Sequence, residues 1–252
     1  AKFLGGEPFL IPLYYKIWDL IKTHNPKCSI HITTNGTIFN NAVNNVLANN
    51  LKIIFSLDTI SKTLYSKIRK GGNFEYMMDN LDYFSNKLQH SQNFQITTCF
   101  MQQNWHEIPD IIKFSNKHNS YIYLNVVLYP SLASIWQCDT SYLKQIKKEY
   151  QKVKLSKNNI IETHNYNKFN ELKKLINTYI KKNHKINRII NNTNSLSIAE
   201  LIGLINKKIK MGCKYFSFDK GTETKLIESM EKLINKQENE NDKSQILKFF
   251  LL

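Results

Sequence analysis

The chain has 252 residues, 42% of them hydrophobic, which is typical of a globular protein and enough for one α/β barrel or two small domains. No apolar run reaches the roughly 20 residues of a membrane-spanning helix, so we predict no membrane association. The net charge is +15, but only Arg69 and Arg188 are arginines among 35 basic residues. Arginine side chains, which bind phosphates and base edges through two hydrogen bonds at once, are therefore scarce. The excess of lysine is better explained by the codon bias of an AT-rich genome than by a nucleic-acid-binding face.

The chain has four cysteines, and they are widely separated. None of their spacings matches a zinc ribbon or a Cys-x-x-Cys redox site, so we predict no metal site built from them. Scattered free thiols are typical of a reducing compartment, and we predict a cytoplasmic protein. The cysteines are Cys28, Cys99, Cys138 and Cys213.

The first element is a short apolar strand at residues 2–4, which ends at two glycines. Pro8 suits the first turn of a helix, and an apolar stripe at spacings of three and four continues to Ile21. Between them, Gly5-Gly6-Glu7 places a carboxylate beside glycine backbone. Such a carboxylate can accept strong hydrogen bonds from a ligand ammonium, or it can be a solvated residue in an ordinary turn, and the tetrapeptide alone leaves both interpretations open.

Further strands and helices alternate along the first half of the chain. Five strands with helices between them, about two dozen residues apart, predict βαβ units in a parallel sheet. Strands are expected at 29–36, 51–58, 93–103 and 121–129, and helices at 40–48, 74–88 and 105–116. From residue 139 the pattern is helical throughout, with helices expected at 142–152, 169–181, 198–209 and 224–236. We therefore predict two domains, 1–138 and 139–252, and expect the apolar tail at 246–252 to pack on the body.

Polar residues follow each predicted strand at its carboxyl end. In parallel α/β folds ligands bind at this edge, so these side chains should converge on one pocket. For Asn35 or Asn104 taken singly, a turn or helix cap is the favoured interpretation. The residues are Glu7, Asn35, Ser56, Asp58, Asn104 and Tyr129.

Three segments in this order resemble the core of a radical SAM enzyme, which uses S-adenosylmethionine (SAM) and an iron–sulfur cluster. They are FLGGEPFL, ITTNG and FSLDTISKTLYSKIRKGGNF, and the resemblance covers about residues 1–130. It implies an α/β fold: a partial parallel (β/α) barrel of the radical SAM type that lacks its first β/α unit, followed by a helical C-terminal region. The segment 98–112 resembles the branch that often carries SPASM or twitch regions.

The resemblance implies a role for each matching residue. Gly5, Gly6 and Glu7 match the motif that holds the methionyl ammonium of SAM through backbone carbonyl and carboxylate. Ser56 and Arg69 match the serine and arginine that meet the methionyl carboxylate. A zwitterion needs one group of acceptors and one of donors, so this division is chemically reasonable.

Four other residues are assigned less directly. Asn35 and Asp58 would lie along the cofactor or substrate side. Val126 and Leu128 could flank the adenine of SAM, but plain core packing is the slightly favoured interpretation.

The family's [4Fe–4S] cluster is held by a Cys-x3-Cys-x2-Cys motif that is absent from this sequence. We therefore expect a fragment, inactive alone, of an oxidoreductase or maturase whose cluster ligands lie upstream. The bound cluster and SAM would generate a 5′-deoxyadenosyl radical that modifies an unknown peptide or small molecule. Two alternatives stay open: a degenerate relative without catalysis, and a basic nucleic-acid-binding module. A radical enzyme that acts on RNA would satisfy both the radical SAM and the nucleic-acid interpretations.

Overall fold

The structure is a computed structural model in which the chain forms two compact units, Ala1–Tyr179 and Ile180–Leu252. Side chains at 185–193 and 212–215 are not described, which leaves out that of Cys213. Leu128, Tyr129 and the predicted apolar tail also lie outside the described residues. The structure describes residues 1–47, 51–88, 93–127, 130, 133–193, 196–215, 219–237, 239 and 242–243.

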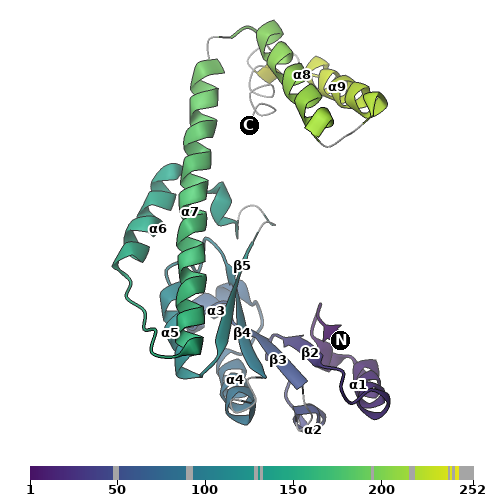
Figure 1. The fold of residues 1–252 in the computed structure, drawn as a ribbon, viewed down its shortest axis with the longest axis vertical. Coiled ribbons are helices and arrows are strands. Elements are labelled where there is room, and N and C mark those ends of the chain that lie inside the picture. The colour runs from purple at the N-terminus through teal and green to yellow at the C-terminus, as the bar shows by residue number, and fades with distance from the viewer. Residues whose placement is uncertain are drawn as a thin grey trace. The chain divides into compact units, whose positions relative to one another are not determined.

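The first unit is built on a five-stranded sheet in which every neighbouring pair of strands is parallel (Figure 1). The order of the strands in space follows their order in the chain, as in (β/α) barrels. The predicted α/β fold with a parallel sheet is therefore confirmed. The strands are β1 (Lys2–Phe3), β2 (Ile30–Thr34), β3 (Leu51–Ser56), β4 (Phe94–Phe100) and β5 (Tyr121–Val126).

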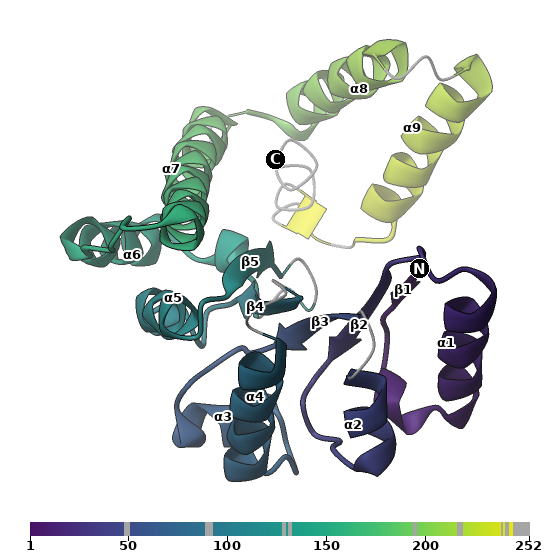
Figure 2. The ribbon, with the colours of Figure 1, turned by 60° about the horizontal axis from the view of Figure 1, so that its bottom comes forward.

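Helices connect the strands, and Figure 2 shows α1, α2 and α4 along one side of the sheet. The short helix α3 was not predicted. Of its seven residues Tyr65 is the one that is buried, so the sequence shows little of the apolar periodicity that indicates a helix. The helices are α1 (Pro12–His24), α2 (Asn41–Leu47), α3 (Lys62–Ile68), α4 (Phe74–Leu88) and α5 (Ile108–Lys117).

The predicted helix start at Pro8 is wrong. Residues Pro8–Leu10 form a 3₁₀ turn, η1, and the α-helix begins at Pro12. A proline at position 12 has no N–H to donate to the carbonyl of residue 8, so an α-helix cannot continue through it. Pro12 instead occupies the first turn of α1, where the missing N–H costs nothing.

The core of the first unit lies between the sheet and these helices. Along β2 and β3 buried and half-buried residues alternate strictly, so one face of each strand is covered. Ile32, Ile53 and Ile96 on this face are fully buried. Phe55 packs edge-on against Phe84 of α4, with ring centroids 6.0 Å apart. The other face carries polar side chains, unlike the continuous apolar strands of a sheet buried on both sides.

The first unit extends beyond the sheet to include α6 (Thr140–Lys152) and the start of α7 (Ile160–Thr193), which the sequence analysis placed in the C-terminal region. The fully buried Asn165 of α7 accepts from the backbone N–H of Ile122 at 2.9 Å. Its amide donates to the Ser120 carbonyl at 2.9 Å and to Asn116 Oδ1 at 2.8 Å. The start of α7 is therefore fixed to the beginning of β5.

The second unit is helical, as predicted for this part of the chain. Helices α8 (Ile198–Tyr215) and α9 (Lys220–Asn235) pair through a small core that contains Leu201, Ile205 and Met230. Among the described residues, no helix combines the length and apolar character needed to cross a bilayer.

Gly36 and Gly71 provide a matched test of the packing at the end of β2. Both have positive φ, +73° for Gly36 and +79° for Gly71. A Cβ added to Gly36 would lie 2.0 Å from Phe55 Cζ, whereas a Cβ added to Gly71 would have no neighbouring atom within 4 Å. We expect Gly71→Ala to cost about 1–2 kcal/mol for the left-handed backbone. Gly36→Ala should cost about 1–3 kcal/mol more, from overpacking. Urea unfolding measures both, and equal losses would contradict the described packing.

Candidate functional site

The candidate site is the edge of the sheet where the strands end. Thr34 pairs with Phe55 across β2 and β3, and Ser56 pairs with Thr97 across β3 and β4. Because the strands run in the same direction, their carboxyl ends form one rim. The polar residues that follow them in the sequence are therefore brought to the same edge, as expected from the sequence.

Glu7 is a buried carboxylate, 7% exposed, that joins the ends of the first two strands. Its Oε1 accepts from the Phe9 N–H at 3.2 Å and from Thr34 Oγ1 at 2.9 Å. Its Oε2 accepts from the Asn35 N–H at 2.8 Å. A carboxylate has about four acceptor positions, so one position on Oε2 remains for a ligand. The structural role of Glu7 and its hydrogen bond with Thr34 were not predicted.

Gly5 and Gly6 leave their backbone open beside this carboxylate. Both have positive φ, +94° and +59°, and neither would place a Cβ within 4 Å of any atom. Both residues are exposed. A ligand can therefore lie directly against the glycine backbone and its carbonyl groups, a space that side chains at these positions would fill.

Asp58 lies behind Arg69 rather than in open space. Asp58 Oδ2 accepts from Arg69 Nη2 at 2.6 Å, and Oδ1 accepts from the Cys99 N–H at 2.9 Å. The Asp58 side chain is 6% exposed and that of Arg69 is 38% exposed. The guanidinium has five N–H donors and only one is engaged by Asp58, so the exposed donors can meet an anionic ligand.

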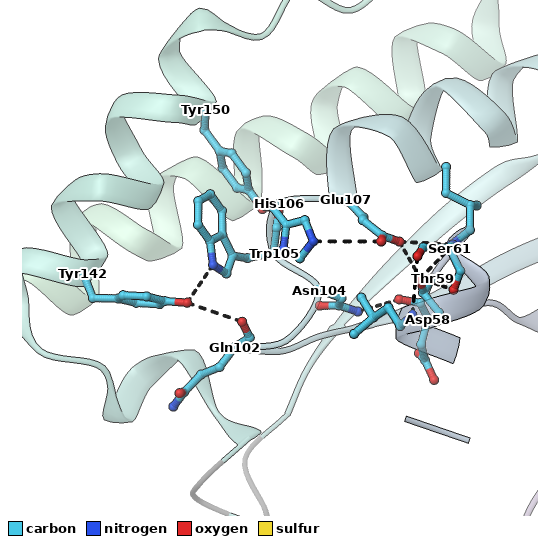
Figure 3. A network of polar contacts seen from close by, with 12 residues as sticks. Asp58, Thr59, Ser61, Gln102, Asn104, Trp105, His106, Glu107, Tyr142 and Tyr150 are labelled. Carbon is cyan, nitrogen blue, oxygen red and sulfur yellow. Dashed lines mark hydrogen bonds and ion pairs between the residues drawn. The ribbon is translucent and has the colours of Figure 1, made fainter. Parts of the chain in front are cut away.

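A fully buried amide, Asn104, fixes Asp58 in turn (Figure 3). Its Nδ2 donates to the carbonyl groups of Asp58 and Cys99, both at 2.7 Å, while Oδ1 accepts from the Met101 N–H at 2.9 Å. A turn or cap was the favoured prediction for Asn104. The bond to Met101, three residues earlier, is a local contact of this kind. The side chain also joins the ends of two strands, which no local pattern in the sequence reveals.

Glu107 adds a second link at the same edge, as Figure 3 shows. Its Oε2 accepts from Thr59 Oγ1 at 2.5 Å and from the Ile60 N–H at 3.1 Å. The loop after β3, which leads to Arg69, is thereby tied to the start of α5. Glu107 was not among the predicted site residues.

Asn35 and Ser56 occupy different surroundings. Asn35 Oδ1 accepts from the N–H and hydroxyl of Thr37, at 2.9 and 2.6 Å, so its side chain forms the predicted type of turn. Asn35 and Arg69 together line a pocket of about 460 Å³. Ser56 is half-buried at the end of β3 and is not among the residues that line this pocket.

The described residues do not fit an iron–sulfur cluster. Within them, no three His, Cys, Asp or Glu side chains gather in a way that could hold a metal ion. Burial, with the charge of Asp58, raises the pKa of the Cys99 thiol, and burial followed by the charge of Asp139 raises that of Cys138.

Comparison with known proteins gives one family match. The model of the Radical SAM superfamily matches residues 1–115. The comparison with curated protein sequences found no match.

Solved structures resemble the chain more weakly. Streptococcus suis SuiB bound to SAM is 17% identical with a TM-score of 0.43, over 60% of this chain and 35% of SuiB. SuiB bound to the precursor peptide SuiA is 18% identical with a TM-score of 0.44, over 60% of this chain and 34% of the other. TYW1 with a lysine-pyruvate adduct is 19% identical with a TM-score of 0.40, over 62% and 51%. The chain thus spans about a third of SuiB and half of TYW1.

These likenesses are too low to carry an argument, and the assignment depends on the family model. Its match covers the strands and loops that build most of the rim, from Gly5 through Asn104. Residues 1–115 of this chain therefore match the radical SAM superfamily.

Proposed function

We propose that the first unit binds SAM at the rim and is the core of a radical SAM enzyme, an oxidoreductase or maturase that modifies a peptide or small molecule. The observation that carries this proposal is the pairing, at one edge of a parallel sheet, of open glycine backbone with a half-exposed guanidinium. The family match supports it.

The two kinds of group suit the two charged ends of the methionyl part. The carbonyl groups of Gly5 and Gly6, with the remaining acceptor position of Glu7, would hold the ammonium. The free donors of Arg69, with the Ser56 hydroxyl, would hold the carboxylate. Both sets of contacts are charge-assisted and therefore stronger than neutral hydrogen bonds.

The remaining residues would position these groups and do not need to touch the cofactor. Asp58 orients Arg69, Asn104 fixes Asp58, and Asn35 lines the adjoining pocket. In this superfamily, bound SAM is the source of a 5′-deoxyadenosyl radical that abstracts hydrogen from a substrate. The described residues offer no set of ligands for the cluster, so we assign none of them a role in holding it.

Replacing Arg69 with glutamine tests the proposed carboxylate contact. Hydrogen bonds to charged groups contribute about 1.5–3 kcal/mol, so SAM affinity should fall about 10- to 100-fold. Lys67→Gln removes the same charge from an exposed position on α3 and should leave the affinity unchanged. Isothermal titration calorimetry with SAM measures both. A chain that does not bind SAM, or equal effects of the two substitutions, would refute the proposal.

Replacing Asp58 with asparagine tests its positioning role. The amide keeps an acceptor for the Cys99 N–H but loses the ion pair to Arg69, so SAM binding should weaken less than in Arg69→Gln. Because Asp58 acts through Arg69, the double variant Asp58→Asn/Arg69→Gln should bind SAM like Arg69→Gln alone. Additive losses in this double-mutant cycle would show instead that Asp58 contacts the ligand directly.

A further inference from the structure

The sheet has a second face, opposite α1, α2 and α4, that forms a pocket of its own. Its volume is about 590 Å³, within the range of pockets that hold drug-sized ligands. The side chains come from all five strands or the residues next to them, so the pocket extends across the whole sheet. It is lined by Lys2, Leu4, His31, Thr33, Lys52, Ile54, Gln95, Thr97, Tyr123 and Asn125.

A row of basic side chains crosses one end of this pocket. Lys2 is the partner of His31 in the pairing of β1 with β2, and His31 is the partner of Lys52 in the pairing of β2 with β3. The three side chains therefore lie side by side on one face. No carboxylate lines the pocket, and among the described residues neither lysine has an ion-pair partner. Burial, then the charges of Lys52 and Lys2, lowers the pKa of His31, as expected where positive charge is concentrated.

Gln95 offers an amide to a ligand in the pocket. Its side chain lines the pocket and has no hydrogen-bond partner within the described part of the chain. A ligand with both an acceptor and a donor, such as a peptide group, would pair with this amide.

We propose that this face binds an acidic peptide segment. A glutamate or aspartate carboxylate of the peptide would lie between Lys2 and Lys52, beside His31, and a peptide group would pair with the Gln95 amide. Thr33 and Asn125 offer further polar contacts across the pocket.

The number and kind of side chains favour a peptide over a nucleic acid. Two lysines in one row can neutralise one or two negative charges, whereas a nucleic acid needs a basic groove that follows its backbone and aromatic platforms for its bases. The pocket has a single tyrosine, Tyr123, and no arginine. Its extent across five strands also exceeds what a small free anion would occupy.

The row lies on the same sheet as the proposed SAM site but at its other end. Lys52 lies four positions before Ser56 along β3, which corresponds to about 13 Å. Binding of the peptide does not require SAM, whereas its role as the substrate rests on the proposed function.

A charge-matched comparison tests the basic row. A labelled glutamate-rich peptide should bind the chain in fluorescence anisotropy at low salt, and the same peptide with glutamines should not. Lys2→Gln/Lys52→Gln should weaken binding about tenfold. The control Lys67→Gln/Lys144→Gln removes two exposed charges elsewhere and should have little effect. Equal binding of the two peptides, or equal losses in the two double variants, would overturn the proposal.

Gln95→Leu separates a ligand contact from a structural role. If the amide is unpaired in the free protein, leucine should not lower the melting temperature, but it should weaken peptide binding severalfold. A lower melting temperature with unchanged peptide affinity would overturn this part of the proposal. An RNA oligonucleotide that binds more tightly than the acidic peptide, and that also depends on Lys2 and Lys52, would overturn the choice of ligand.

A SAM titration keeps this inference distinct from the proposed function. Lys2→Gln/Lys52→Gln should bind SAM as the unaltered chain does, because neither lysine lies at the rim. Loss of SAM binding in this variant would contradict the separation of the two sites. If SAM binds normally and the acidic peptide does not bind at all, the peptide inference fails while the proposed function stands.

Discussion

The rim of the sheet depends on one buried carboxylate that accepts hydrogen bonds from the segment after β1 and from the end of β2. An ionised side chain removed from water is unstable unless it is well hydrogen-bonded, and Glu7 meets this condition with donors from Phe9, Thr34 and Asn35. Those donors belong to the loop after β1 and to the end of β2, so their positions are fixed together. Gly5 and Gly6 precede Glu7 and contribute no side chain, and their backbone is thereby presented at a defined place on an otherwise packed edge.

The ends of β3 and β4 are also joined by the hydrogen bonds of one buried polar side chain, here an amide in place of a carboxylate. Asn104 is fully buried and bonds to the carbonyl groups of Asp58 and Cys99. Asp58 then directs Arg69, whose guanidinium reaches the surface. Buried polar groups that are fully paired make this edge rigid, and a rigid edge presents its donors and acceptors without reorganisation. The other face of the sheet differs, because the Gln95 amide and the ammonium groups of Lys2 and Lys52 lack such partners within the described residues.

The sequence was sufficient to predict the parallel sheet and the rim, because apolar strands and the polar residues after them are local patterns. The start of α1 was mispredicted because Pro8 and Pro12 both suit a first helical turn. Pro12 has no N–H to donate to the carbonyl of Pro8, and this missing hydrogen bond places the start of the helix at Pro12. Long-range pairing could not be predicted at all. Nothing near Asn104 indicates that its side chain reaches Asp58, and nothing near Glu7 indicates Thr34. The roles of the site residues toward SAM stay predictions, as do the SPASM or twitch region and the cytoplasmic location.

The central claim is that open glycine backbone and a guanidinium, held at one rim, bind the two charged ends of SAM. A crystal structure of the chain with SAM tests it most directly. The account predicts the methionyl carboxylate on the exposed donors of Arg69 and the ammonium against Gly5, Gly6 and Glu7. SAM bound elsewhere on the chain, or bound at the rim with its methionyl end away from Arg69 and the glycines, would contradict it.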